Sequence, residues 1–411
     1  MGKGLHQKWM YTVMPYAAIG SGLSVIIPLY ILSLKGTVFD VGIALSIYYL
    51  VSVPSSIIWG RLTDKIGRAR MFILLSLFGT LPVILIIYLM AHIVLLEFDY
   101  GLYALVATAA SPSLNILVMG TRKNPNLPKY FSRYSIISII GTIIAFAAGI
   151  FVSYDYIHYY LDFLLALNIV ALVLSYIFVK SIPKKAVSKE RLSMASRMFA
   201  LLNSLSFLPH LMTGTPLVER IQRSARIKRV KRIYTLFIAI SLFNLGSAVF
   251  NTSYIPYLRS FGIAYGNVFL INLLNGLAQL LIYAVVLVIA KRIDIGNYYK
   301  TATALRSASY LIAIVPIFVL TGVFLQLNII LYFMAGIAYA YWNISSSVMV
   351  YNNVRGGHKG YYLGMWAAII GLSSVIGAFV SGVISAGFSY PYTFLLAAAL
   401  TVVSLSVFSK C

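Results

Sequence analysis

The sequence predicts an all-α integral membrane protein whose twelve transmembrane helices form two six-helix bundles, related by a pseudo-two-fold axis along the membrane normal. Three observations lead to this fold class. Of the 411 residues, 61% are apolar and only 10% are charged, whereas soluble domains are about 45–50% apolar and about 25% charged. The apolar residues also fall into twelve runs, and the second six runs repeat features of the first six.

Each run is long enough to cross a bilayer, because a helix needs about 20 apolar residues to span roughly 30 Å of hydrocarbon. The runs do not alternate as the strands of a membrane barrel would. The first run exceeds the apolar core of a secretory signal, about 7–15 residues, so we expect it to remain as a span. The predicted spans are 10–34, 39–59, 71–95, 101–120, 134–154, 160–180, 233–257, 266–290, 301–322, 326–350, 361–385 and 390–409.

The basic residues set the predicted orientation. The chain carries a net charge of +23, and 30 of its 32 Lys and Arg residues fall on one side of these spans, leaving only Lys35 and Arg259 on the other. Cytoplasmic loops concentrate Lys and Arg, so both termini are predicted to be cytoplasmic in a multi-pass protein of the plasma membrane. This distribution explains the positive charge without a nucleic-acid partner.

An internal repeat relates the two halves of the chain. Four features recur in order after 228 to 231 residues: Ile27-Pro28 as Ile255-Pro256, Asp64 as Asp294, Ile139-Ile140-Gly141 as Ile369-Ile370-Gly371, and Phe163-Leu164-Leu165-Ala166 as Phe394-Leu395-Leu396-Ala397. Parallel repeats of this kind are typical of transporter folds. We therefore predict bundles at 1–180 and 233–411, joined by a basic cytoplasmic connection at 181–232.

The connection at 181–232 has two interpretations. It is a solvated basic linker, or its apolar positions at helical spacing form interfacial helices that bind anionic membrane lipid. It lacks the interleaved aromatic residues of a nucleic-acid-binding surface.

One motif is specific. The segment Gly60-Arg61-Leu62-Thr63-Asp64-Lys65-Ile66-Gly67-Arg68-Ala69-Arg70 lies between the second and third spans. It resembles the signature of the major facilitator superfamily, G-x-x-x-D-[R/K]-x-G-[R/K]-x-[R/K], at all six defined positions. The resemblance implies the fold predicted above and a secondary transporter that works by alternating access.

The resemblance also implies a conformational gate. In the family, the motif aspartate, here Asp64, contacts the start of span eleven, near Tyr361, and a basic residue at the end of span four, for which Arg122 is the candidate. The remaining gate residues are Gly60, Lys65, Gly67, Arg68, Arg70 and Asp294. This chain lacks the embedded arginine of span four and the Gly-Pro pair of span five that many proton-coupled relatives carry, which puts proton antiport in doubt.

The predicted spans contain no ionisable residue near their middle. Glu97, Asp99 and Arg306 are all assigned to helix ends or loops. A cavity without fixed charge offers nothing to offset the desolvation of an ion. The expected solute is therefore a small neutral or lipophilic organic molecule, with export favoured over import. Facilitated diffusion, or coupling through peripheral groups such as Asp40 or His92, remains open.

The candidate substrate-binding residues follow from the resemblance, in which spans 1, 4, 7 and 10 face the central cavity. They are polar or aromatic residues of these spans and of spans 8 and 11: Tyr30, Asn115, Asn244, Asn251, Asn272, Asn275, Gln279, Tyr341, Trp342, Asn343 and Trp366. Asn272, Asn275 and Gln279 share one helical face. Their alternative role is interhelical hydrogen bonding, and that of Trp366 is interfacial anchoring. Pro112 in span four either exposes backbone carbonyls to a ligand or only kinks the span.

The sequence therefore predicts a monomeric transporter of a small-molecule substrate that also contacts membrane lipid. No catalytic, phosphate-binding or metal-ligand motif is present, so no enzymatic activity, cofactor or metal is expected. The alternative is a non-transporting receptor or scaffold of the same fold, which would use the basic connection to bind a partner or lipid.

Overall fold

The computed structural model describes residues 5–66, 68–89, 92–120, 127–179, 226–289, 295–315, 321–353 and 359–409. Most of the 181–232 connection lies outside these ranges. The described part of the first half forms η1 (Leu5–Thr12), α1 (Val13–Ser33), α2 (Val38–Ile66), α3 (Ala69–Leu89), α4 (Ile93–Ala107), α5 (Ala110–Gly120), α6 (Leu127–Gly149), η2 (Tyr154–Tyr156) and α7 (Ile157–Phe178). That of the second half forms α10 (Arg226–Ser260), α11 (Tyr265–Ile289), α12 (Ile295–Ile312), α13 (Thr321–Asn353), α14 (Lys359–Gly387) and α15 (Tyr390–Phe408).

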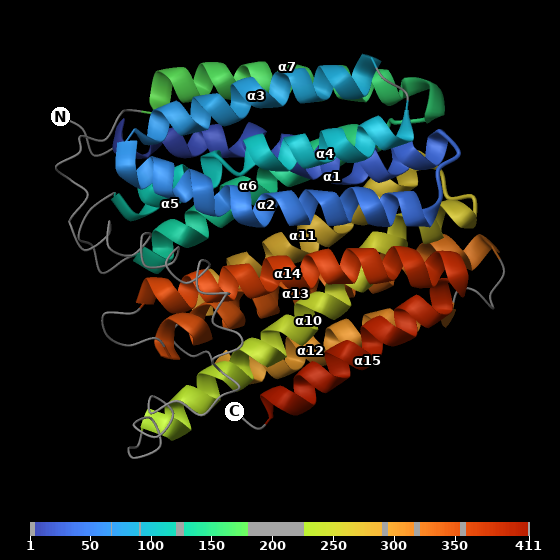
Figure 1. Ribbon diagram of the computed structural model, residues 1–411. Helices are drawn as coiled ribbons and strands as arrows, with labels where there is room; N and C mark the ends of the chain where they lie inside the picture. Colours follow the sequence, from blue (N-terminus) through green and yellow to red (C-terminus); the bar gives the residue numbers. More distant parts are fainter. Residues whose placement is uncertain are drawn as a thin grey trace, which may run out of the picture.

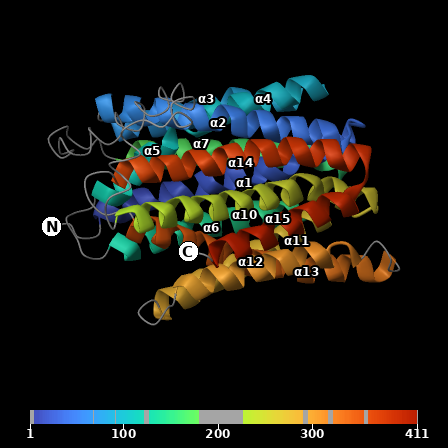
Figure 2. The same cartoon turned by 60° about the horizontal axis from the view of Figure 1, so that its bottom comes forward.

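The helices run lengthwise beside one another (Figures 1 and 2). Within the described residues, ten helical segments are long and apolar enough to cross a membrane. The other two predicted spans correspond to α6, whose apolar part is Tyr134–Gly149, and to α12, which carries Lys300 and Arg306. Counting α4 and α5 as one interrupted span, the described chain thus contains the twelve predicted spans.

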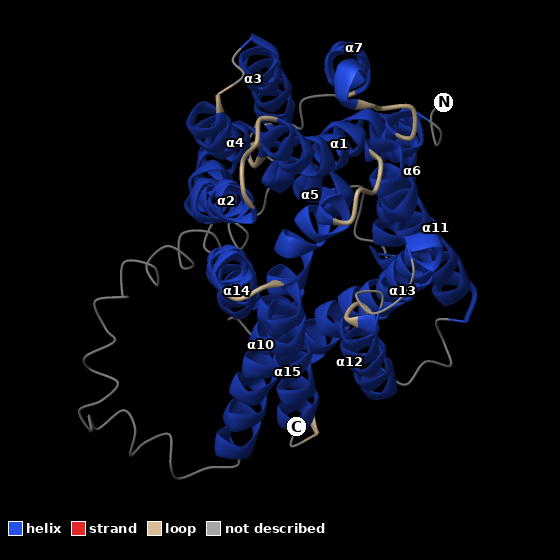
Figure 3. Ribbon diagram, turned by 90° about the vertical axis from the view of Figure 1, so that its right-hand side faces the viewer, coloured by secondary structure: helices blue, strands red, loops and turns tan. Residues whose placement is uncertain are grey.

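The two bundles are visible when the molecule is viewed along its helices. Figure 3 shows α1 to α7 grouped on one side and α10 to α15 on the other. In the first bundle α1 packs on α6 and α7, α3 on α4 and α7, and α2 on α4. In the second, α10 packs on α14 and α15, α12 on α13 and α15, and α11 on α13. Each contact recurs six spans later, so the repeat read from the sequence is also a repeat of packing.

The bundles meet along two seams, α2 against α14 and α6 against α11. Glycines bring the backbones together there, since a Cβ on Gly42 would lie only 2.8 Å from the Cα of Gly382. Gly149 packs against the Phe269 ring, and Gly266 packs against the carbonyl of Ile150. These contacts lie toward the end where α2 and α11 begin, called here the far end. The other end, where α1 begins and α15 ends, is the termini end.

The structure corrects two boundary predictions that concern charged residues. Helix α4 begins at Ile93 rather than at 101, so Glu97 and Asp99 lie inside it, 7% and 5% exposed. Helix α12 begins at Ile295 rather than at 301, which places Arg306 well inside the helix, 3% exposed. Charged residues close to an apolar run lead the sequence to predict a helix end there. Charged side chains that face the interior of a bundle are nevertheless compatible with a span.

Candidate functional site

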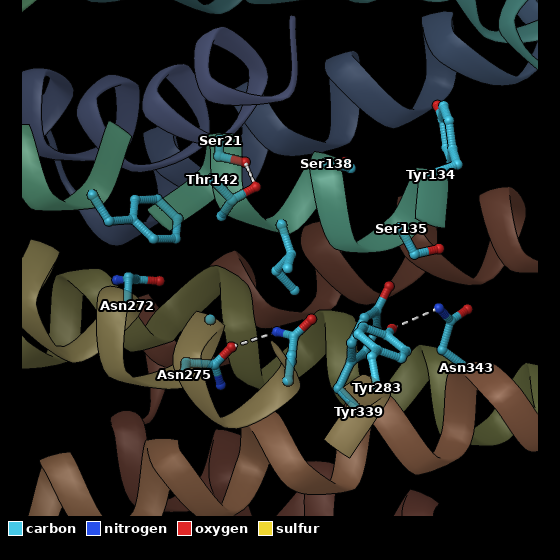
Figure 4. Close-up of a pocket in the computed structure, with 14 residues that line it drawn as sticks. Ser21, Tyr134, Ser135, Ser138, Thr142, Asn272, Asn275, Tyr283, Tyr339 and Asn343 are labelled. Atoms are coloured by element: carbon cyan, nitrogen blue, oxygen red, sulfur yellow. Dashed lines mark hydrogen bonds between the residues drawn. The ribbon is translucent and has the colours of Figure 1, made fainter. Parts of the chain in front are cut away.

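A cavity of about 350 Å³ lies between the two bundles, and α6 and α11 supply most of its wall. Ser21 of α1 and two residues of α13 complete it. Figure 4 shows the side chains of both bundles facing one another across this space. The lining residues are Ser21, Tyr134, Ser135, Ser138, Ile139, Thr142, Phe146, Asn272, Asn275, Gly276, Gln279, Tyr283, Tyr339 and Asn343. A volume of this size is in the range of pockets that hold small organic ligands, about 300–1,000 Å³.

Two matching rows of polar side chains form the opposite walls. Ser135, Ser138 and Thr142 follow one another at spacings of three and four on α6, and Asn272, Asn275 and Gln279 do the same on α11. Such spacings place each trio on one helical face. The sequence predicts the α11 row. It does not predict the α6 row, because the family resemblance supplies candidates only from spans 1, 4, 7 and 10 and from spans 8 and 11. The spacing of the hydroxyl residues on α6 was the signal that could have indicated the second row.

Hydrogen bonds to two backbone carbonyls and to a neighbouring amide hold the side chains of the α11 row in place. Asn275 Nδ2 donates to the carbonyl of Tyr332 on α13 at 2.7 Å. Gln279 Nε2 donates to Asn275 Oδ1 at 2.7 Å, and Asn272 Nδ2 donates to the carbonyl of Val268 at 2.9 Å. The row therefore lines the cavity and links α11 to α13, so its interhelical role is observed while substrate binding stays a prediction.

Two further hydrogen bonds position side chains at the edges of the cavity. Asn343 Nδ2 donates to the Tyr283 hydroxyl at 2.9 Å, which joins α13 to α11. The hydroxyls of Ser21 and Thr142 lie 2.7 Å apart, which joins α1 to α6. The described lining residues include no Asp, Glu, Lys, Arg or His. The cavity wall is therefore polar and uncharged.

The predicted absence of charge from the middle of the spans is nevertheless wrong. Arg306 lies eleven residues into α12, about 16 Å along the helix axis at 1.5 Å per residue. Its Nε donates to the Tyr310 hydroxyl at 2.7 Å, a terminal nitrogen donates to the Ala335 carbonyl at 2.9 Å, and the other donates to Asn251 Oδ1 at 3.2 Å. These acceptors are all neutral, so within the described part of the chain the guanidinium is held by hydrogen bonds to uncharged groups.

Arg306 is close to the cavity without lining it. It donates to the carbonyl of Ala335, whose neighbour Gly336 packs against Asn275 of the cavity wall. Because charge interactions weaken slowly in a medium of low dielectric constant, this cation makes the cavity unfavourable for another cation.

The first bundle also contains a buried ionisable residue, Asp99 of α4. Both of its carboxylate oxygens are buried, and no described group donates a hydrogen bond to them. An ionised carboxylate in such a place costs several kcal/mol. Sequence reasoning missed it because Asp99 was assigned to a loop.

Replacement of Asp99 by leucine is therefore expected to leave the unfolding temperature unchanged or to raise it, because exchanging an unpaired buried polar group for an apolar one is often neutral or stabilising. Thermal unfolding of the purified protein in detergent measures this. A clear fall in the unfolding temperature would show that the carboxyl group has a stabilising partner.

The predicted substrate-binding residues divide into two groups. Asn272, Asn275, Gln279 and Asn343 line the cavity. The others do not: Tyr30 is buried beside His158, Asn244 donates to the Ile370 carbonyl and to Ser374, Asn251 accepts from Arg306, Tyr341 packs on Tyr298, and Trp342 and Trp366 belong to the core around Phe243. The side chain of Asn115 lies outside the described residues.

The gate motif is only partly described. The side chains of Asp64 and Tyr361, and all of Gly67, Arg122 and Asp294, lie outside the described residues. Lys65 and Arg68 are exposed, and the nearest atom to a Cβ built on Gly60 is in Pro112, 4.0 Å away. A terminal nitrogen of Arg70 donates to the Tyr176 carbonyl of α7 at 2.7 Å, and its guanidinium lies over the Tyr176 ring. Arg70 therefore ties the motif segment to its own bundle.

The helix interruption near Pro112 is a kink. Helix α4 ends at Ala107 and α5 begins at Ala110. The Trp59 indole donates to the Leu105 carbonyl at 2.7 Å, and the Tyr16 hydroxyl donates to the Ala107 carbonyl at 2.7 Å. Both carbonyls are used by the protein itself, which favours the second of the two interpretations over a ligand site.

Known proteins share this architecture. The Major Facilitator Superfamily model matches residues 10–326. A mutant of the nucleoside transporter NupG is 15% identical to this chain, with a TM-score of 0.76 and coverage of 99% of both chains. A POT family transporter in complex with a thioalcohol-conjugated peptide is also 15% identical, with a TM-score of 0.73 and coverage of 98% of this chain and 96% of its own. No curated protein sequence matches the chain.

Proposed function

Because this chain belongs to the major facilitator superfamily and is a multi-pass membrane transporter rather than an enzyme, we propose that it carries a small neutral organic solute by alternating access. The cavity between the bundles is the proposed binding site. The observation that carries the proposal is its lining, which is rich in hydrogen-bonding groups and contains no ionisable acid or base among the described residues. Such a wall can replace the hydration of a polar neutral solute but not that of an ion.

The cavity suits a solute that carries both hydrogen-bonding groups and apolar surface. Most of the described lining residues carry an amide or a hydroxyl group, and the rings of Tyr134, Tyr283 and Tyr339 join Ile139 and Phe146 as apolar surface. A purely apolar ligand would leave many of these groups without partners, each at a cost of roughly 1–3 kcal/mol. Two proteins of the same fold are named as a nucleoside transporter and a peptide-binding POT family transporter. Export, which the sequence slightly favours for an uncharged, aromatic cavity, stays a prediction.

The proposed cycle follows from the two seams. The bundles, 1–180 and 233–411, rock against one another while 181–232 connects them on the cytoplasmic side. Close contacts of Gly149 and Gly266 support closure of the far end in this conformation, with access from the termini end. With both termini in the cytoplasm of a plasma-membrane protein that works as a monomer, this is an inward-facing state.

Solute flux into proteoliposomes tests the proposal. Purified protein is reconstituted, and counterflow is measured for radiolabelled neutral solutes, an organic anion and an organic cation. We expect saturable flux for at least one neutral solute and none for the ions. Flux of the anion alone would overturn the neutral-solute assignment, and measurement in vesicles of defined orientation would determine the direction.

Asp64→Asn tests the proposed gate. The substitution is expected to reduce flux about tenfold, equivalent to ~1.4 kcal/mol, while the amount of protein in the membrane stays near the wild-type level. A neutral side chain cannot make the charge-assisted contacts that close the termini end. Equal losses of flux and of membrane protein would show that the residue is only structural.

A further inference from the structure

We infer that the membrane potential regulates this carrier through Arg306, whose buried positive charge stabilises the inward-facing state when the cytoplasm is negative. This inference rests on the proposed alternating-access cycle and concerns how that cycle is controlled. It is carried by the position of the charge, which lies beside the cavity and within the region across which the membrane potential falls.

Arg306 is the single Lys, Arg or His residue that is buried in the described part of the chain, with 3% of its surface exposed. The guanidinium of an arginine stays protonated in proteins, so it carries a full positive charge here. The Tyr310 hydroxyl, the Ala335 carbonyl and Asn251 Oδ1 accept its hydrogen bonds, and all three are uncharged. No described side chain that bonds to the guanidinium therefore neutralises it.

The charge lies at the depth of the cavity. Its acceptor Ala335 is followed by Gly336, and a Cβ on Gly336 would lie 3.1 Å from Asn275 Nδ2 in the cavity wall. Asn275 is ten residues from the start of α11 at the far end, about 15 Å along the helix at 1.5 Å per residue. The hydrocarbon region is roughly 30 Å thick. The guanidinium therefore lies near the middle of the membrane.

Rocking of the bundles changes the electrical potential at this depth. When the cavity opens to the cytoplasm, water and ions bring the cytoplasmic potential to the cavity, and the potential then falls across the closed far end. When the cavity opens at the far end instead, the same depth takes the outside potential. A negative cytoplasm lowers the free energy of a positive charge at the cytoplasmic potential, so it favours the inward-facing state.

The size of the effect follows from one charge. A unit charge that crosses the whole of a 100 mV potential shifts an equilibrium about fiftyfold. Because Arg306 lies behind the cavity wall and not in its lining, we take half of the potential to act on it, which gives a shift of about sevenfold. Each complete cycle returns the charge to its starting place. The potential therefore sets the resting state and the rate of the carrier, but not the final concentration ratio of a neutral solute.

Energy transfer between two dyes at the far end measures the resting state without any solute. In a Cys411→Ser background, the substitutions Phe151→Cys and Phe388→Cys place the dyes at exposed positions just after α6 and α14. The full-length protein is reconstituted in vesicles of defined orientation, and valinomycin with a potassium gradient sets the potential. We expect about 100 mV, negative on the cytoplasmic side, to raise the ratio of close to distant far-end states about sevenfold. A ratio that does not change with the potential would overturn the inference.

Asn251→Asp tests whether Arg306 is the charge that responds. Aspartate keeps an oxygen where Asn251 accepts from Arg306 at 3.2 Å, and its negative charge makes the pair neutral. The ratio should then be nearly independent of the potential. Arg306→Gln removes the charge directly and should have the same effect, which keeps the test decisive if one of the two variants fails to fold. A full response in the folded variants would contradict the role of Arg306.

Lys300→Met and Asp99→Asn are the matched controls. The first removes an exposed cation from the same helix, and the second removes a buried carboxyl group of the first bundle, whose ionised form would be costly there. Both should respond to the potential as the wild type does, and a response lost in either control would assign the charge elsewhere. A response without solute flux would leave this inference standing and overturn the transport proposal. Flux by a protein whose ratio ignores the potential would overturn this inference alone.

Discussion

Replacing Arg306 with methionine is expected to destabilise the protein by about 3 kcal/mol, because it leaves buried hydrogen-bond acceptors without a donor at roughly 1–3 kcal/mol each. Arg306 joins three helices of the second bundle, since it lies on α12 and donates to Asn251 of α10 and to the Ala335 carbonyl of α13. Its Nε also donates to Tyr310, whose hydroxyl in turn donates to Ser247 of α10. The loss should appear as a lower unfolding temperature in detergent and as less protein in the membrane.

Lys300→Met provides the control for this prediction. Lys300 lies on the same helix and is exposed, so the same change of a cation to methionine removes no recorded buried contact. Its unfolding temperature should stay close to that of the wild type. Arg306→Lys should be intermediate, because lysine keeps the charge but cannot reach three acceptors with a planar group. If Arg306→Met and Lys300→Met were equally stable, the hydrogen bonds of the guanidinium would contribute nothing to folding.

The second large effect is expected at the far end of the α6–α11 seam. A Cβ on Gly266 would overlap the backbone carbonyl of Ile150, which cannot move aside as a flexible side chain can. Gly266→Ala should therefore hold the two bundles apart at the far end and shift the population away from the conformation seen here. We expect flux to fall about tenfold or more, equivalent to ~1.4 kcal/mol, while the unfolding temperature changes little.

Thiol labelling can detect this shift, because Cys411 is the only cysteine of the chain. In a Cys411→Ser background, a cysteine introduced at Ser138 in the cavity should react faster with an impermeant reagent from the far side when Gly266→Ala is present. Gly387→Ala is the matched control, since a Cβ there meets no atom within 4 Å. Unchanged labelling together with normal flux would mean that the seam accommodates the methyl group by a local adjustment.

Much of the architecture was predictable because it depends on composition and on periodicity along the chain. The two bundles, the spans and the repeat follow from apolar runs and from offsets between similar segments. The errors fell where a charged side chain points into a bundle. Asp99 and Arg306 interrupt apolar runs, and sequence alone does not distinguish a charge at a helix end from one that other helices shield from lipid.

The site was predictable only in part. Asn272, Asn275 and Gln279 share a helical face that the sequence reveals, and the structure places them in the cavity wall. Asn244 and Trp342 are likewise a polar and an aromatic residue within predicted spans, but they contact other helices of the second bundle. The difference depends on which faces of α10 and α13 meet other helices, and no local pattern encodes that.

By itself, the sequence determined that this is a twelve-span membrane protein of two related halves with an asymmetric distribution of charge, because the bilayer imposes length, polarity and orientation on each span separately. Only the tertiary structure decided the chemistry of the interior. The hydroxyl row of α6 faces the amide row of α11 because the seam brings those two helices together. Arg306 is stable in the interior because the Ala335 carbonyl and Asn251 Oδ1, both distant in sequence, accept hydrogen bonds from its two terminal nitrogens.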